Sequence, residues 1–174
     1  ETMDRTCVCI LVDKEEIGSV GATGMDSRFF ENATAEILCK MGLTSSLSLR
    51  RTLKNTMMLS SDVNSAYDPL NASLYDKKNS SFLGGGVVFN KYTGSRGKSG
   101  ASDANPEFIG KIRAVLEKNG VKYQMAEMAK VDVGGGGTIA KFSAYYGMQV
   151  IDCGVAILSM HAPWEIASCS DIVN

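Results

Sequence analysis

Short apolar runs alternate with segments of helical period along the whole chain, and this alternation most constrains its fold. The run Cys7–Val12 is apolar and β-branched enough to be a buried strand. Ser27–Met41 follows it with apolar residues on one helical face. Alternating strands and helices of this size are typical of layered α/β folds. The sequence therefore predicts one α/β domain over residues 1–174, with a mixed, largely parallel sheet flanked by helices.

The same criteria predict the later elements. We expect strands at Thr56–Ser60, Gly86–Asn90, Val121–Met128, Gln149–Cys153 and Val155–Leu158, and helices at Leu47–Asn55, Pro106–Asn119 and Thr138–Tyr146. Asp68–Ser81 is rich in Asn, Ser and Asp and is expected to be a surface loop. Lys91–Ser102 is rich in glycine, serine and cations, and Ala162–Pro163 is expected to open a terminal helix.

Charge and cysteine content narrow the classes of function. The formal net charge of −1 argues against nucleic acid as the main partner, because no face can carry a large excess of cations. No apolar run approaches the length of a membrane span, and no signal peptide is visible at the N-terminus. Five cysteines without a Cys-x-x-Cys spacing indicate free thiols in a reducing compartment. The sequence thus predicts a cytoplasmic protein.

Two adjacent carboxylates, Glu15 and Glu16, stand where the first apolar run gives way to glycine. Gly18 and Gly21 oppose an immediate helix after them. Adjacent carboxylates at a strand exit repel each other, and no cluster of Lys or Arg is in position to neutralise them. A divalent metal would do so, with one carboxylate as ligand and the other handling the proton of a metal-bound water. The alternative is a solvated, charged turn.

Two other predicted strands also end in candidate metal ligands. Thr56–Ser60 leads to Asp62, and Val155–Leu158 leads to His161, the only histidine of the chain. Sites in open α/β sheets form at the carboxyl ends of strands, so these residues can meet the glutamate pair. Carboxylates with one imidazole suit zinc, and also manganese or cobalt. A lone histidine is by itself weak evidence, being more often a core or surface residue.

A phosphate-binding loop is a third interpretation, built around Lys98. The segment Gly94–Ser99 contains Gly-Lys-Ser, but the pattern requires a glycine where this chain has Tyr92. Gly134–Gly137 precedes a predicted helix and could bind an anion, although a tight strand-to-helix turn explains it more simply. We therefore favour the metal site over nucleotide binding.

Four segments together resemble a known family. Asp-Lys-Glu-Glu-Ile-Gly-Ser at 13–19, Ser-Ser-Asp-Val-Asn at 60–64, Gly-Gly-Thr-Ile at 136–139 and Ser-Met-His at 159–161 are similar, in this order, to motifs of the aspartyl aminopeptidase/aminopeptidase I family. These are cytosolic or vacuolar di-zinc exopeptidases. Residues 91–98 resemble the bacterial aminopeptidase I branch in particular.

The resemblance implies a role for each candidate residue. Glu15 would be the general base, Glu16 and His161 would bind one zinc, and Asp62 would bind the other. It further implies a zinc-dependent aminopeptidase with two zinc ions per complete active site, with Co²⁺ or Mn²⁺ as possible replacements. The substrates would be peptides, and the enzyme a homo-oligomer, commonly a dodecamer.

The chain also departs from the family pattern. Family members carry a further histidine ligand and a bridging aspartate upstream; this chain has no second histidine, and Asp4 is too close to the first predicted strand to bridge. We therefore expect it to correspond to the C-terminal half of the catalytic domain. The resemblance would place a cation for acidic side chains in Leu83–Gly86, which is mostly glycine, and this favours neutral or broad specificity. Lys91, Arg96 and Lys98 are nearby alternatives for such a cation. The alternative to an enzyme is an incomplete fragment that serves only as a structural or assembly unit.

Overall fold

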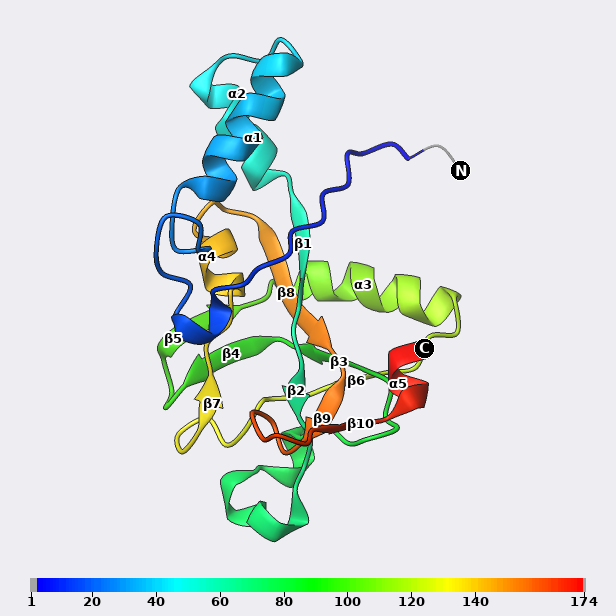
Figure 1. Cartoon of the computed structure of the whole chain (residues 1–174). Coiled ribbons are helices and arrows are strands. Elements are labelled where there is room, and N and C mark those ends of the chain that lie inside the picture. The colour runs from blue at the N-terminus through cyan, green and yellow to red at the C-terminus, as the bar shows by residue number, and fades with distance from the viewer. Residues whose placement is uncertain (1–2, 174) are drawn as a thin grey trace. The chain divides into compact units, whose positions relative to one another are not determined.

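The computed structural model describes residues 3–173 and divides the chain into two compact units, residues 1–44 and 45–174 (Figure 1). Each unit is described by itself. The expectation that all 174 residues belong to one catalytic domain stays a prediction.

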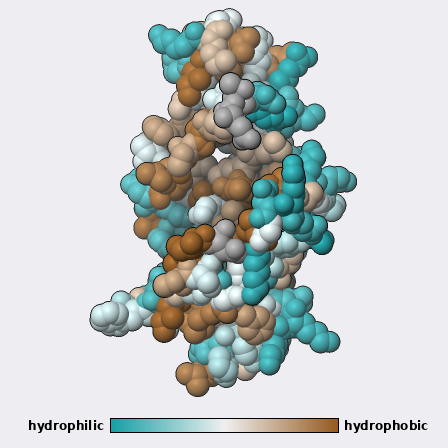
Figure 2. Space-filling model, turned by 90° about the vertical axis from the view of Figure 1, so that its right-hand side faces the viewer, coloured by the Kyte–Doolittle hydropathy of each residue, from teal (hydrophilic) through white to brown (hydrophobic). Residues whose placement is uncertain are grey.

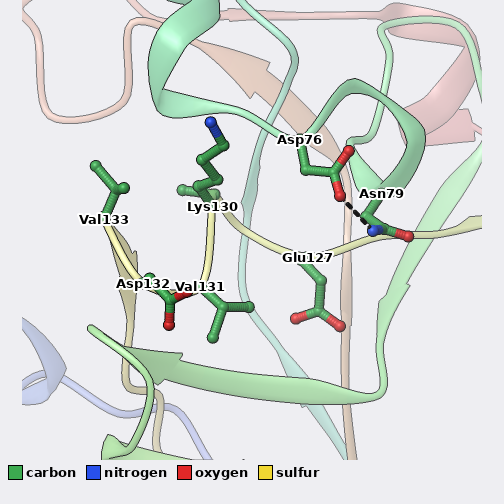
Figure 3. A pocket seen from close by; sticks show the side chains of 8 residues that line it. Asp76, Asn79, Glu127, Lys130, Val131, Asp132 and Val133 are labelled. Atoms are coloured by element: carbon green, nitrogen blue, oxygen red, sulfur yellow. Dashed lines mark hydrogen bonds between the residues drawn. The ribbon is translucent and has the colours of Figure 1, made fainter.

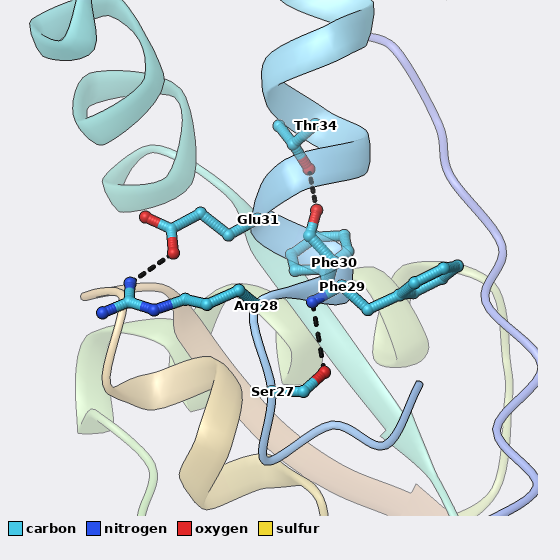
Figure 4. A network of polar contacts seen from close by, with 6 residues as sticks. All are labelled: Ser27, Arg28, Phe29, Phe30, Glu31 and Thr34. Atoms are coloured by element: carbon cyan, nitrogen blue, oxygen red, sulfur yellow. Dashed lines mark hydrogen bonds and ion pairs between the residues drawn. The ribbon is translucent and has the colours of Figure 1, made fainter. Parts of the chain in front are cut away.

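The first unit contains a one-turn 3₁₀ helix, η1 (Glu15–Ile17), and the helix α1 (Phe29–Lys40). Local polar contacts define the start of α1 (Figure 4). Ser27 Oγ accepts the first helical amide N–H at 3.1 Å, and Arg28 forms an ion pair with Glu31. Thr34 Oγ1 donates to the carbonyl one turn earlier at 2.9 Å. The predicted helix is thereby confirmed, two residues shorter at its start.

The strand predicted at Cys7–Val12 does not form. These residues belong to no strand, and the side chains of Val8 and Leu11 are 63% and 94% exposed. A strand needs a partner whose N–H and C=O groups complete its ladder. Residues 3–44 contain no other strand, so this apolar run has no partner within its own unit.

The second unit is built on a four-stranded sheet in the order β1-β8-β3-β6 (Figure 1). Its strands are β1 (Met57–Ser61), β3 (Val87–Asn90), β6 (Tyr123–Met125) and β8 (Gln149–Gly154). β1 runs parallel to β8 and β3 parallel to β6, while β3 and β8 are antiparallel. This mixed sheet, with parallel pairs in the majority, confirms the predicted fold class.

Successive residues of β3 pack into two separate hydrophobic clusters. Phe89 packs with Phe108 of helix α3 (Pro106–Lys118) and with Ile151 of β8. Val88 packs instead in a second cluster with Ala156. Because successive side chains of a strand point to opposite faces, one short strand anchors both.

Two three-stranded sheets complete this unit, in the orders β10-β9-β2 and β5-β4-β7. Their strands are β2 (Asn64–Ser65), β4 (Tyr92–Ser95), β5 (Ser99–Asp103), β7 (Gly135–Gly136), β9 (Ala156–Leu158) and β10 (Ile166–Ala167). The glycine-rich segment after Asn90 is thus a hairpin. Gly97 supplies a φ of +92° in its turn, a conformation that glycine adopts without strain.

The remaining elements are short. They are α2 (Ser46–Lys54), η2 (Pro69–Leu74), η3 (Lys77–Asn79), α4 (Ala140–Ala144) and α5 (Cys169–Val173). The prediction that a helix opens at Ala162–Pro163 is wrong, because these residues lie in a turn, after which β10 runs back antiparallel to β9.

Helices that could cross a bilayer are lacking among the described residues. Apolar side chains are visible on the face shown in Figure 2.

Candidate functional site

The glutamate pair lies on η1, whose end is defined by tight backbone contacts. Gly18 ends the turn with a φ of +87°, and its N–H donates to Glu15 O at 2.9 Å. A side chain at Gly24 would place its Cβ 1.9 Å from Ser19 O, so only glycine fits there. Successive residues of a 3₁₀ helix point about 120° apart, as three residues complete a turn. Glu15, half-buried, and Glu16, exposed, therefore project in different directions and can do different work.

Asp62 lies directly after β1, where the chain crosses β8 at very close range. Its N–H donates to Cys153 O at 3.2 Å, and its Oδ1 accepts the N–H of Val63 at 2.7 Å. A Cβ at Gly154 would stand 1.6 Å from Asp62 O. The backbone that carries this carboxylate is thus fixed against a position that only glycine can occupy.

His161 lies in the connection between β9 and β10. Its φ is +65°, and that of Ser159 is +59°. The backbone N–H of His161 donates to Glu165 Oε1 at 2.7 Å, and Ala162 N–H donates to Ser159 O at 2.9 Å. The only histidine of the chain is exposed, and its backbone has a left-handed conformation that is uncommon outside glycine but is found more often for histidine than for most other residues.

The pairing of β2 with β9 relates two of the candidate ligands. Asn64 of β2 stands opposite Ala156 of β9 in this parallel ladder. Asp62 lies two residues before Asn64, and His161 lies five residues after Ala156. Glu15 and Glu16 belong to the other unit. Among residues 3–173 the structure gathers no three His, Cys, Asp or Glu side chains around one point. The proposed ligand set stays a prediction.

A buried carboxylate near Asp62 escaped the sequence analysis. Asp152 is only 5% exposed and lies opposite Ser60 in the β1–β8 ladder. Its Oδ2 accepts a hydrogen bond from Thr138 Oγ1 at 2.9 Å. Its Oδ1, like the hydroxyl oxygens of Ser60 and Thr93, is buried without a hydrogen-bond partner.

Burial raises the pKa of Asp152 to about 6. The hydrogen bond from Thr138 lowers this pKa, and the charge of Asp62 raises it further. The sequence held one signal of such a group, a single carboxylate inside an otherwise apolar predicted strand.

A cavity of about 450 Å³ lies elsewhere in the second unit, lined by Asp76, Glu127, Lys130 and Asp132 among others (Figure 3). Burial raises the pKa of Glu127 to about 7, which Lys91 opposes. Asp76 already accepts a hydrogen bond from Asn79 Nδ2 at 2.7 Å. None of the predicted site residues lines this cavity.

The donor types at the predicted positions fit zinc. Carboxylates and one imidazole are ligands that zinc accepts in catalytic sites. The hydrogen bond from Val63 occupies one acceptor position of Asp62 Oδ1, and the carboxylate has further lone pairs to offer a metal. Glu16 and His161 supply a second carboxylate and the imidazole.

Comparisons with known proteins identify a family. The family described as aminopeptidase I zinc metalloprotease (M18) matches residues 1–174. A probable M18 family aminopeptidase 1 of Clostridium acetobutylicum is 61% identical over 168 residues, covering 97% of this chain and 36% of the relative.

Solved structures agree with this match. The crystal structure of the M18 aminopeptidase from Thermotoga maritima is 47% identical, with a TM-score of 0.88, and the match covers 93% of this chain and 36% of that one. The S. cerevisiae mApe1 dodecamer is 25% identical, with a TM-score of 0.60, over 86% of this chain and 31% of that one. The chain thus spans about a third of the length of the proteins it matches.

Proposed function

Because this chain belongs to the aminopeptidase I (M18) family of zinc metalloproteases, we propose that it forms part of a zinc aminopeptidase that releases N-terminal amino acids from peptides. The observation that supports this most is the family match over all 174 residues, which includes the glutamate pair on its sharply ended turn.

Each candidate residue has one role in this proposal. Glu16 and His161 hold one zinc ion, and Asp62 holds the other. Zinc held by these residues would polarise the peptide carbonyl and lower the pKa of the attacking water. Glu15 takes the proton from that water and delivers it to the leaving amine. The different directions of Glu15 and Glu16 on η1 support this division between base and ligand.

We further propose a preference for neutral or varied N-terminal residues. The N–H groups of Gly84 and Gly86 donate to the buried carboxylate of Asp171, at 2.7 and 2.9 Å. Lys122, the cation next to this segment, donates to Gly84 O at 2.7 Å. These contacts hold the segment to the protein itself, which supports a site without a cation for acidic side chains.

Location and assembly follow the same reasoning. The five cysteines all lie within the described residues and form no disulfide, which supports a cytoplasmic enzyme. The yeast relative is a dodecamer, and we propose a homo-oligomer here as well. The competing proposal is that this polypeptide alone is only a structural part of such an assembly, since one histidine cannot complete the family's ligand set.

Two variants of the full-length gene product test the enzyme proposal. Glu15→Gln should lower the turnover number by ~100-fold or more, the usual contribution of a general base, without changing the zinc content. His161→Ala should instead remove one of two zinc ions, as measured by elemental analysis. Glu36→Gln, the same change at an exposed site on α1, is the control. Full turnover of the Glu15 variant would refute its role as base.

A further inference from the structure

The chain places a histidine at a turn position that glycine normally occupies. Ser159 to Ala162 form a turn closed by the hydrogen bond from Ala162 N–H to Ser159 O at 2.9 Å. His161 is the third residue of this turn, with a φ of +65°. At this position a positive φ is characteristic of glycine or asparagine. Histidine is among the side chains other than glycine that adopt a positive φ more readily, and its place in this turn motivates a hypothesis about how the imidazole is directed.

A carboxylate four residues later holds this backbone in place. Glu165 Oε1 accepts the N–H of His161 at 2.7 Å, at the short end of the range for an N–H···O hydrogen bond. Glu165 directly precedes β10, whose Ile166 is paired with Leu158 of β9. The hairpin ladder therefore fixes the starting point of the Glu165 side chain, and the carboxylate reaches across the loop to His161.

We propose that Glu165 is a positioning residue that acts through the backbone of His161. By accepting that N–H it holds the left-handed conformation and so sets the direction in which the imidazole is presented to zinc. The inference rests on the proposed function, because it takes His161 as a zinc ligand. Glu165 itself neither binds the metal nor transfers a proton in this account.

A pair of substitutions separates this role from a role of the charge. Glu165→Ala removes the acceptor, and Glu165→Gln removes the charge but keeps an amide oxygen that can accept the same N–H. Glu107→Ala, which removes an exposed carboxylate from the first turn of α3, is the matched control. All are made in the full-length gene product.

Zinc affinity is the first readout, measured by competition with a chelator. Loss of a partner that orients a ligand typically weakens metal binding ~10-fold to 100-fold, and we expect this of Glu165→Ala. Glu165→Gln should lose much less, and the control nothing. Equal losses in the alanine and glutamine variants would overturn the proposal, since they would assign the effect to the charge.

Amide hydrogen exchange of His161 is the second readout and needs neither metal nor activity. Exchange should be faster in Glu165→Ala than in the wild type and close to the wild type in Glu165→Gln. Unchanged exchange in the alanine variant would overturn the proposed contact, even where affinity falls.

His161→Ala separates a failure of this inference from a failure of the proposed function. If this variant loses zinc affinity and Glu165→Ala does not, only the role of Glu165 is refuted. If His161→Ala keeps full zinc affinity, the histidine is no ligand, and both proposals fall.

Discussion

Replacing Asp152 by asparagine should make the protein more stable at neutral pH and less sensitive to pH. The carboxylate is 5% exposed, and burial raises its pKa from 3.8 to about 6. In the unfolded chain this carboxylate ionises near pH 3.8. Between pH 3.8 and about 6 the folded state therefore keeps the proton of Asp152, which the unfolded state has lost. Stability contributed by the protonated form is therefore present below pH 4 and is lost as the pH rises through about 6.

The size of this loss follows from the pKa difference. At ~1.4 kcal/mol per pH unit, ionisation of Asp152 costs the folded state about 3 kcal/mol above pH 7. The asparagine side chain is neutral and has the same shape as aspartate, and its amide oxygen can still accept the hydrogen bond from Thr138. Relative to the wild type, Asp152→Asn should gain stability as the pH rises from 4 to 7, up to about 3 kcal/mol.

Urea unfolding followed by far-ultraviolet circular dichroism at a series of pH values measures this difference directly. Comparing the variant with the wild type cancels the contributions of the other titrating groups. Asp132→Asn, at an exposed position, is the control and should follow the wild-type curve. If the stability difference between Asp152→Asn and the wild type is the same at pH 5 and pH 8, the carboxylate does not titrate as a buried group, and the reasoning fails.

Three further predictions concern backbone and burial. Gly154→Ala should lower the free energy of unfolding by about 3 kcal/mol or more, because its Cβ would stand 1.6 Å from Asp62 O. Gly110→Ala should instead raise it by about 0.5–1 kcal/mol, because a Cβ at this position of α3 meets nothing within 4 Å. The melting temperatures of the two variants test both predictions. Ser159→Gly should raise the free energy of unfolding by up to about 1 kcal/mol by relieving a φ of +59°, and a loss would contradict the left-handed backbone. Glu127→Gln should gain stability relative to the wild type as the pH rises through 7, because burial raises this pKa to about 7; parallel pH curves in urea would refute it.

Several helices and strands of the second unit form close to the bounds that the sequence predicts. The helix predicted over Pro106–Asn119 forms as Pro106–Lys118, because proline suits its first turn and its apolar face packs on the sheet. The strands predicted at Gly86–Asn90 and Gln149–Cys153 form within one residue of their expected bounds. Local propensity and tertiary packing agree in these elements, so periodicity alone was sufficient.

Two local signals in the sequence were misleading because the pairing of strands, and not local propensity, decided the outcome. Cys7–Val12 has the composition of a strand, but composition does not supply the neighbouring strand that a ladder requires. Ala162–Pro163 has a helix-start signal, yet the pairing of β10 with β9 turns the chain back instead. Asp152 was missed as a site residue because its contact with Thr138 depends on packing that no local pattern encodes.

Backbone strain occurs at one predicted site residue and near another. Among residues 3–173, four non-glycine residues have a positive φ, and three of them flank or include predicted site residues: Ser19, Ser159 and His161. Such conformations cost ~1–3 kcal/mol each, and the exposed Arg96 in the turn between β4 and β5 shows that a turn outside the predicted site can hold one as well. Asp62 adds a close approach that only glycine at position 154 permits. Of the predicted site residues, His161 alone has a positive φ itself, so backbone strain bears on its predicted role, and the roles of Glu15, Glu16 and Asp62 stay predictions.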